Sequence, residues 1–282
     1  MTKKFMRWPK FKEKALTLSY DDGVIYDKKL IEIMQKNGLR GTFNINSGWF
    51  TEHTGDRRMK KEEAYKLYTE SNNEVAVHGV RHMPLDAINE ACAVNDVIND
   101  RLALEETFGT IIQGMAYAYG TYTDGVVELL KKCGIKYART VTTTERFDIP
   151  SDWLRMPTTC HHNNPRLMEL ARQFVEDKGN RSFHSHAPKL FYLWGHSYEF
   201  NDNDNWNVIE EFAEYVGNRD DIWYATNIEI YDYVKAFDSL EYSASGRLIH
   251  NPTATDVYIS YVDREYVIRA GETVEVIPMN HK

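Results

Sequence analysis

The sequence lacks the features that mark two broad classes of protein. Its 34 basic residues are outnumbered by 42 acidic ones, which gives a net charge of -8, so the basic face of a nucleic-acid-binding protein is not expected. No stretch approaches the roughly 20 apolar residues that cross a bilayer. Residues 1–14 are basic and aromatic, without the apolar run of a signal peptide. These absences predict a cytoplasmic protein with no nucleic-acid partner and no membrane span.

Cysteine is also scarce. Cys92, Cys133 and Cys160 are widely spaced, and none belongs to a C-x-x-C pattern, which argues against a disulfide framework or a zinc knuckle. We expect buried, inert thiols. What is present is an ordinary globular composition, with 282 residues of which 42% are hydrophobic, enough for one large domain or two small ones.

Short apolar runs alternate along the chain with segments of helical periodicity. Strands are expected at 15–20, 41–45, 74–77, 115–118, 137–140, 190–194 and 222–225. Helices are expected at 27–36, 60–69, 87–108, 124–133, 165–176, 206–216 and 228–237, the third of them behind Asp86 as N-cap. Repeated β–α order implies a parallel sheet, and about seven or eight units in roughly 240 residues fit a closed or nearly closed (β/α) barrel. An open doubly wound sheet is the alternative, but no glycine-rich phosphate loop follows the first strand.

The pattern changes after Phe237. Residues 257–262, 266–269 and 274–277 are rich in β-branched and aromatic residues and are separated by turn signals. We therefore expect a barrel over residues 1–237 and a small β-rich extension over 238–282 that packs on it.

Polar residues follow several expected strands, where a (β/α) barrel carries its active site. Asp21 and Asp22 end the first strand, and His196 follows the strand at 190–194. His78 and His82 follow the third strand, and a spacing of four places both imidazoles on one face if they begin a helix. Two histidines and one carboxylate at the same rim form a common ligand set for a divalent metal ion.

Four segments, taken together and in order, resemble the motifs of the polysaccharide deacetylase family (NodB homology domain, carbohydrate esterase family four). They are Thr17-Leu18-Ser19-Tyr20-Asp21-Asp22-Gly23, His78-x-x-x-His82, Tyr117-Ala118-Tyr119-Gly120 and Leu193-Trp194-Gly195-His196. The resemblance covers about residues 14–237. It implies a deformed, TIM-like (β/α) barrel of seven or eight units. It also implies a hydrolase that removes acetyl groups from a carbohydrate, with N-acetylglucosamine-type sugars as the first expectation.

The resemblance also implies roles for individual residues. Asp21 would be the general base, His196 the general acid, and the backbone N–H of Tyr119 a donor to the oxyanion. One divalent ion is implied, zinc in the first place, with cobalt, nickel, manganese and iron as alternatives. Its ligands would be Asp22, His78 and His82.

The sequence departs from the family pattern in its supporting residues. Ala116 stands where the family has an arginine that orients the base, and either Arg139 or Arg155 could supply the guanidinium instead. Either Asp152 or Asp148 could be the carboxylate that pairs with the acid histidine.

Other positions near the motifs invite interpretation. Gly79 stands where the family usually has serine or threonine. Aromatic residues can stack on sugar rings, and four are expected to contact substrate: Trp49, Tyr117, Tyr122 and Trp194. The histidines at 161–162 and 184–186 are interpreted as loop residues, or else as contacts behind the site or with the substrate.

Three rival interpretations remain at this stage. The same ligand set occurs in non-haem iron oxygenases, although Asp21 and His196 would then have no evident task. A small non-sugar amide could be the substrate of an amidohydrolase with this barrel. Ala116 at the arginine position is also compatible with a carbohydrate-binding homologue whose catalysis is impaired.

Overall fold

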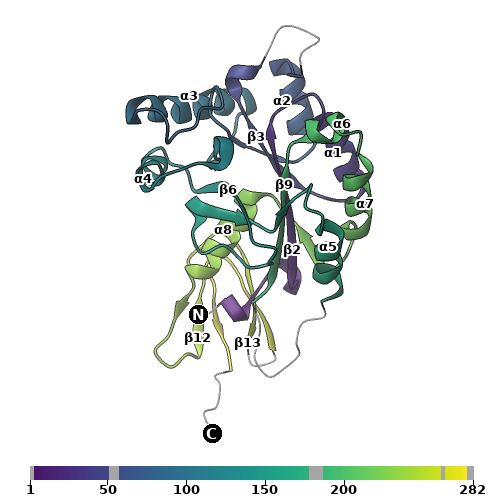
Figure 1. The fold of residues 1–282 in the computed structure, drawn as a ribbon. Helices are drawn as coiled ribbons and strands as arrows, with labels where there is room; N and C mark the ends of the chain where they lie inside the picture. Colours follow the sequence, from purple (N-terminus) through teal and green to yellow (C-terminus); the bar gives the residue numbers. More distant parts are fainter. Residues whose placement is uncertain (1–2, 51–56, 178–186, 262–263, 278–282) are drawn as a thin grey trace.

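Parallel strands form the centre of the molecule (Figure 1) in the computed structural model, which describes residues 3–50, 57–177, 187–261 and 264–277. Within these ranges the central sheet has nine strands: β2 (Lys14–Asp22), β3 (Gly41–Ile45), β4 (Glu74–Val77), β5 (Gly114–Ala116), β6 (Tyr137–Thr143), β7 (Met156–Thr158), β8 (Cys160–His161), β9 (Lys189–Gly195) and β10 (Ile222–Tyr224). They lie in the order β7-β6-β5-β4-β3-β2-β9-β8, and β10 pairs with the start of β2. Each of these pairings is parallel.

A short segment that contains β7 and β8 closes the sheet into a barrel. β7 pairs with β6 and β8 pairs with β9, so the chain from 156 to 161 bridges the two ends of the sheet. Between β7 and β8, the Thr159 N–H donates to the Tyr192 carbonyl and the Glu145 N–H donates to the Thr159 carbonyl, both at 2.9 Å. The predicted (β/α) barrel is therefore confirmed, although β7 and β8 were not among the expected strands.

Helices cover the outside of the barrel (Figure 1): α1 (Asp27–Lys36), α2 (Lys61–Glu70), α3 (Glu90–Phe108), α4 (Asp124–Lys132), α5 (Leu167–Glu176), α6 (Ser197–Asp202), α7 (Asn207–Val216) and α8 (Asn227–Asp238). The predicted N-cap of α3 was wrong. Asn89 caps this helix by accepting from the Cys92 N–H at 2.9 Å, as its short polar side chain allows. Asp86 instead accepts from the Thr121 hydroxyl at 2.7 Å.

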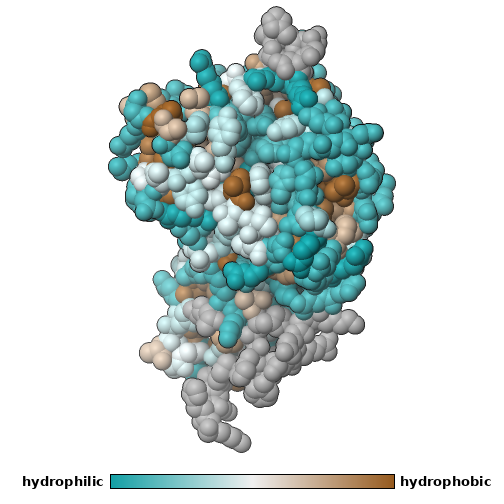
Figure 2. All heavy atoms as spheres, viewed as in Figure 1, coloured by the Kyte–Doolittle hydropathy of each residue, from teal (hydrophilic) through white to brown (hydrophobic). Residues whose placement is uncertain are grey.

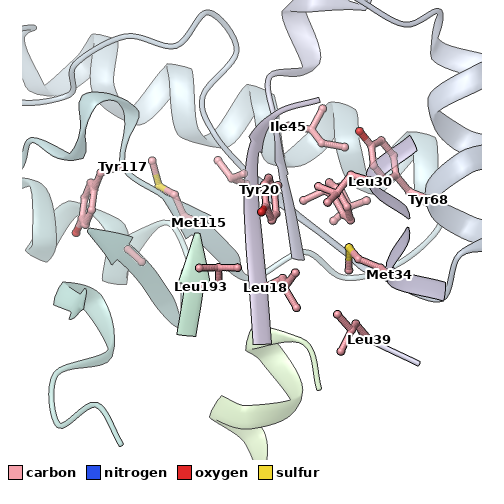
Figure 3. Packing of buried hydrophobic residues seen from close by; sticks show 14 of the residues in the cluster. Leu18, Tyr20, Leu30, Met34, Leu39, Ile45, Tyr68, Met115, Tyr117 and Leu193 are labelled. Atoms are coloured by element: carbon pink, nitrogen blue, oxygen red, sulfur yellow. The ribbon is translucent and has the colours of Figure 1, made fainter. Parts of the chain in front are cut away.

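Alternation along β2 separates an apolar face from a polar one. Leu18 and Tyr20 belong to the buried apolar cluster that joins the strands to the surrounding helices (Figure 3). Ser19 and Asp21 point the other way, into the barrel, where both contact the amide of Asn44 on the neighbouring β3. Because successive residues of a strand face opposite sides, the chain that builds the core also delivers polar side chains to the barrel axis.

Two antiparallel three-stranded sheets pack below the barrel (Figure 1), in the orders β1-β13-β14 and β11-β12-β15. Their strands are β1 (Met6–Arg7), β11 (Glu241–Tyr242), β12 (Leu248–His250), β13 (Val257–Tyr261), β14 (Arg264–Ile268) and β15 (Thr273–Glu275). Ile259 of β13 shares a buried apolar cluster with Tyr233 of α8 and Leu190 of β9. The extension is thus joined to the barrel through an apolar core, and β1 lies with the extension.

The exposed surface is mostly hydrophilic. On the face shown in Figure 2, apolar residues are scattered in small groups, as is usual for protein surfaces. Across the described ranges, the helices are all too short or too polar to cross a membrane.

Candidate metal-dependent active site

The two carboxylates at the end of β2 lie at the rim of the barrel. Asp21 is 3% exposed, and Asp22 has a left-handed backbone with φ 82°, a conformation that aspartate tolerates better than most residues. Gly23 follows with φ 68°, and a Cβ there would lie 2.9 Å from Ile45 Cγ2. The tight turn after β2 therefore requires glycine and directs two adjacent carboxylates into one site.

His78 and His82 converge on Asp22. The Nε2 atoms of His78 and His82 lie 3.6 Å and 3.7 Å from Asp22 Oδ1. The expected helical start is not what brings them together, because residues 79–82 form a turn in which Gly79 has φ 83° and His82 φ 55°. The three side chains predicted as ligands do share one site.

The residues present fit a divalent ion. His78 Nδ1 lies 2.9 Å from the Ala116 carbonyl, which assigns the proton to Nδ1 and leaves the Nε2 lone pair facing Asp22. His78 Nε2 and Asp22 Oδ1 are both buried without a hydrogen-bond partner. Buried polar atoms rarely lack a partner, and a nitrogen and an oxygen ligand of this kind suit zinc or another first-row divalent ion.

The electrostatics of the ligands agree with this fit. Burial lowers the pKa of His78 to about 4, so the imidazole is neutral, as a ligand must be. Burial and the nearby charge of Asp21 raise the pKa of Asp22 to about 6. A cation beside Asp22 would offset the effects of burial and of Asp21 and would keep the Asp22 carboxylate charged.

Asp21 is held in its charged form by residues from other strands. Arg139 of β6, fully buried, donates to Asp21 Oδ2, and the Asn44 amide donates to Oδ1 at 2.8 Å. Burial alone would raise the pKa of Asp21, but Arg139, His78 and His196 outweigh it and lower that pKa below its ordinary value. Of the two arginines left open by the sequence, Arg139 is the one that contacts Asp21.

His196 lies between Asp21 and Glu199. Its Nε2 is 3.9 Å from Asp21 Oδ2, and its Nδ1 is 3.0 Å from Glu199 Oε1. Burial alone would lower the pKa of His196, but Glu199 and Asp21 raise it above the ordinary value. Glu199 was not anticipated, although its place three residues after His196 on α6 is a signal that helical spacing offers.

The two aspartates expected to pair with His196 lie elsewhere. Asp152 accepts from the Arg155 guanidinium at 2.6 Å, and Asp148 forms an exposed ion pair with Arg146 at 2.9 Å. Arg155 also contacts Asp124 at 2.5 Å, so it belongs to a surface ion-pair group. Neither Asp148 nor Asp152 therefore pairs with His196. The path of the chain explains this, because residues 144–152 run outside the strands and do not return to the rim.

Two further histidines surround Glu199. The Nε2 atoms of His162 and His161 lie 2.8 Å and 3.3 Å from Glu199 Oε2. The Asn163 N–H donates to His161 Nδ1 at 3.1 Å, so a neutral His161 carries its proton on Nε2 and donates it to Glu199. The group is therefore a hydrogen-bonded support for His196. The histidines at 184–186 lie outside the described residues.

Gly195 leaves room for this support. A Cβ at Gly195 would lie 2.0 Å from His162 Nδ1. The His162 ring is fixed between Tyr20, with ring centroids 5.8 Å apart, and Phe200, at 4.1 Å. The glycine before His196 is thus explained by the close approach of an imidazole to the end of β9.

Aromatic rings border the site on two sides. Trp49 and Tyr119 have ring centroids 5.7 Å and 4.4 Å from that of His82, and Tyr119 is 65% exposed. Trp194, mostly buried, lies 5.8 Å from His196. Tyr117 is buried and stacks on Tyr122 at 4.9 Å, which makes Tyr117 a packing residue and not the substrate contact that was expected.

Comparison with known proteins agrees with this geometry. The family model described as polysaccharide deacetylase matches residues 9–138. A search of curated proteins gives no match. A Mycobacterium smegmatis protein described as a polysaccharide deacetylase has a similar structure, with 17% sequence identity over 83% of this chain and 94% of that chain and a TM-score of 0.57.

Two other solved structures are more distant. The Streptococcus pyogenes deacetylase PplD, in complex with acetate, is 17% identical over 49% of this chain and 62% of that chain, with a TM-score of 0.44. A Bacillus anthracis pseudoenzyme of carbohydrate esterase family 4 is 14% identical over 81% of this chain and 68% of that chain, with a TM-score of 0.48. The fold is that of the M. smegmatis protein, and residues 9–138, which carry Asp21, Asp22, His78 and His82, match the polysaccharide deacetylase family model.

Proposed function

We propose that this protein hydrolyses acetyl groups from an acetylated carbohydrate, with N-deacetylation of N-acetylglucosamine-type sugars as the first candidate reaction. One observation carries the proposal. Asp21 Oδ2 lies 3.9 Å from His78 Nε2 on one side and 3.9 Å from His196 Nε2 on the other. A base between a metal-ligand set and an acid is the arrangement that hydrolysis of an amide requires.

Asp21 is suited to accept a proton from the attacking water. Arg139 keeps its carboxylate charged, and Asn44 holds the other carboxylate oxygen, so the base is both ionised and fixed in orientation. His196 is suited to donate a proton to the departing amine. Its Nδ1–H is bound by Glu199, which directs Nε2 toward the site and stabilises the protonated ring. Amine leaving groups need such an acid.

Asp22, His78 and His82 would hold the divalent ion, with zinc as the first candidate. When bound, the ion would polarise the acetyl carbonyl and lower the pKa of water toward roughly 7. The backbone N–H of Tyr119 is our candidate for the second oxyanion donor, a contact whose removal typically costs about 3 kcal/mol of barrier. Trp49 and Tyr119, whose rings lie beside His82, would stack on the sugar.

The rival functions fit less well. Ala116 raised the question of impaired catalysis, and the contact of Arg139 with Asp21 supplies the guanidinium that was missing. An oxygenase would leave Asp21, His196 and Glu199 without a task. Amide hydrolysis on a small non-sugar substrate uses the same residues, and only the substrate distinguishes it.

The test is acetate release from a panel of N- and O-acetylated sugars and small non-sugar amides, with metal content measured on the same sample. The proposal expects release from at least one acetylated sugar by protein that holds one ion. Release only from non-sugar amides would favour the small-amide hydrolase. Protein that holds its ion and binds chito-oligosaccharides, yet hydrolyses nothing in the panel, would favour the impaired homologue.

A further inference from the structure

We propose that Asp96 and Asp100 of α3, together with Asn46, are positioning residues that hold the turn at 78–82 so that His78 and His82 reach one ion. This inference rests on the metal site of the proposed function. It concerns a departure of this chain from the family pattern, Gly79 in place of serine or threonine.

Asp100 fixes the backbone at the first histidine. This residue is fully buried, and its Oδ2 accepts from the His78 N–H at 3.0 Å. Its Oδ1 accepts from the Ser47 N–H at 2.7 Å. One carboxylate therefore joins the end of β4 to the loop after β3, and each of its oxygens receives a different N–H. The His78 N–H is shared between Asp100 and the Ile45 carbonyl, which lies 3.2 Å away.

Asn46 holds the same turn by hydrogen bonds to backbone carbonyls of the turn. Its side-chain amide, also fully buried, donates to the carbonyls of His78 at 2.8 Å and Gly79 at 2.7 Å. The Gly48 N–H donates to the next carbonyl, that of Val80, at 3.1 Å. Three successive carbonyls of the turn are thus bound by the chain that follows β3.

Asp96 lies one helical turn before Asp100, on the same face of α3. Its Oδ2 is buried and makes no hydrogen bond within the described residues, so Asp96 supports the turn by packing against Gly79 and by the charge interaction of its carboxylate with the N–H groups of Val80 and Arg81. A Cβ at Gly79 would lie 2.3 Å from Asp96 Oδ2, and Gly79 has φ 83°. A serine or threonine here would be strained at this φ and would displace the Asp96 carboxylate from the turn.

These contacts matter because the turn has an uncommon backbone. Both Gly79 and His82 have positive φ, a conformation that persists in a residue such as histidine only when the surroundings enforce it. His78 is fixed at its N–H by Asp100, at its carbonyl by Asn46 and at Nδ1 by the Ala116 carbonyl. Weakening this support lets the two imidazoles separate, and losses of about 10- to 100-fold in metal affinity are typical when such supporting groups are removed.

The experiment compares Asp100→Asn and Asp96→Ala with the wild type and with Glu106→Gln, an exposed carboxylate of the same helix. Zn²⁺ and Co²⁺ affinities are measured on metal-free protein by competition with a chromophoric chelator. Visible spectra are recorded at saturating Co²⁺, and thermal unfolding of each metal-free protein reports whether the fold is intact. We expect about 10- to 100-fold weaker binding and an altered Co²⁺ spectrum in Asp100→Asn and in Asp96→Ala. Glu106→Gln should match the wild type.

The possible failures are distinguishable. If the wild type binds neither ion, the metal site fails, and with it both the proposed function and this inference. If the wild type binds an ion and both variants bind it with the same affinity and spectrum, the inference is overturned while the proposed function stands. Should Asp100→Asn unfold, the partly exposed Asp96 provides the deciding variant.

Discussion

Arg139 donates to the same oxygen of Asp21 that faces His78 and His196. This oxygen, Oδ2, lies 3.9 Å from the Nε2 atom of each histidine. Arg139 also lies over the ring of Trp194, with its guanidinium carbon 4.3 Å from the ring centroid. A buried cation of β6 thus sets the charge of Asp21, the proposed base, and packs against the strand that leads to His196, the proposed acid.

Replacing Arg139 by methionine should destabilise the protein and lower turnover. Removing one partner of a buried ion pair typically costs about 3–5 kcal/mol, because the other charge stays buried and unpaired. Urea unfolding measures the first effect and acetate release the second. Arg155→Met is the matched control, since Arg155 belongs to an exposed ion-pair group and such pairs contribute about 0–1 kcal/mol. Equal effects of the two substitutions would contradict the role of Arg139.

The ion pair between Arg139 and Asp21 also predicts how the stability of the protein changes at acid pH. The pKa of Asp21 in the folded protein is below its ordinary value of 3.8, so its stabilising contribution is present above the unfolded pKa. It is lost as pH falls through the folded pKa. Comparing unfolding free energies of metal-free wild type and Arg139→Met between pH 6 and pH 3 checks this, and the difference between them should shrink toward the acid end.

Asp21→Asn should retain the metal ion and lower turnover by about 10²- to 10⁴-fold, the range that general-base catalysis supplies. The amide keeps the shape of the side chain but cannot accept a proton. Metal content by atomic spectroscopy and kcat for the best substrate of the panel are the two measurements. Near-normal turnover would mean that Asp21 is a structural residue at the end of β2.

Glu199→Gln should lower turnover and move the alkaline limit of activity to lower pH. Glu199 is among the groups that raise the pKa of His196, and the acid must be protonated to act, so removing the negative charge leaves less active enzyme at neutral pH. The pH profile of kcat measures the shift. Asp152→Asn serves as control, because Asp152 contacts Arg155 and caps the turn at 153–155. A shifted profile in this control would call the assignment of Glu199 into question.

Gly195→Ala should destabilise the protein by about 1–3 kcal/mol, a typical cost of inserting atoms into a well-packed core. The added methyl group would lie 2.0 Å from His162 Nδ1, so the imidazole that supports Glu199 has to move. Unfolding free energy and kcat should both fall. Gly125→Ala offers a comparison, since the nearest atom to a Cβ there is Thr123 Oγ1 at an ordinary 3.7 Å, and it should leave kcat unchanged.

The sequence predicts those elements best that have strong local patterns. The bounds expected for α1 (27–36), β3 (41–45) and β4 (74–77) are those observed, because apolar periodicity and turn residues determine them within a short window. Local sequence patterns do not predict β7 and β8. The segment Met156-Pro157-Thr158-Thr159-Cys160-His161 is short and largely polar, and it becomes a strand only because the two ends of the sheet meet there.

The candidate site likewise contains residues that the sequence predicts and residues that it does not predict. Asp21, Asp22, His78 and His82 lie in contiguous motifs, and the structure brings them together. The supporting residues lie outside these motifs. Arg139 is 118 positions from Asp21, and Asp100 is 22 positions from His78. A single sequence carries no signal that joins such positions, and their pairing depends on which strands and helices become neighbours in space.

The pairing of β1 with β13 bears on how the chain reaches this structure. Met6 pairs with Ile259, and Lys14 of β2 pairs with Ile222 and Lys189. Among the described strands, β1 and β2 come first in the chain, and their partners β13, β9 and β10 are made some 170 to 250 residues later. Contacts between residues so far apart in the sequence slow folding, because the entropy cost of closing the loop comes before the contacts can stabilise the chain. During synthesis β2 can pair early with β3, but β9, β10 and the sheet below the barrel are still missing, so chaperone demand and proteolytic vulnerability should be greatest before β13 is complete.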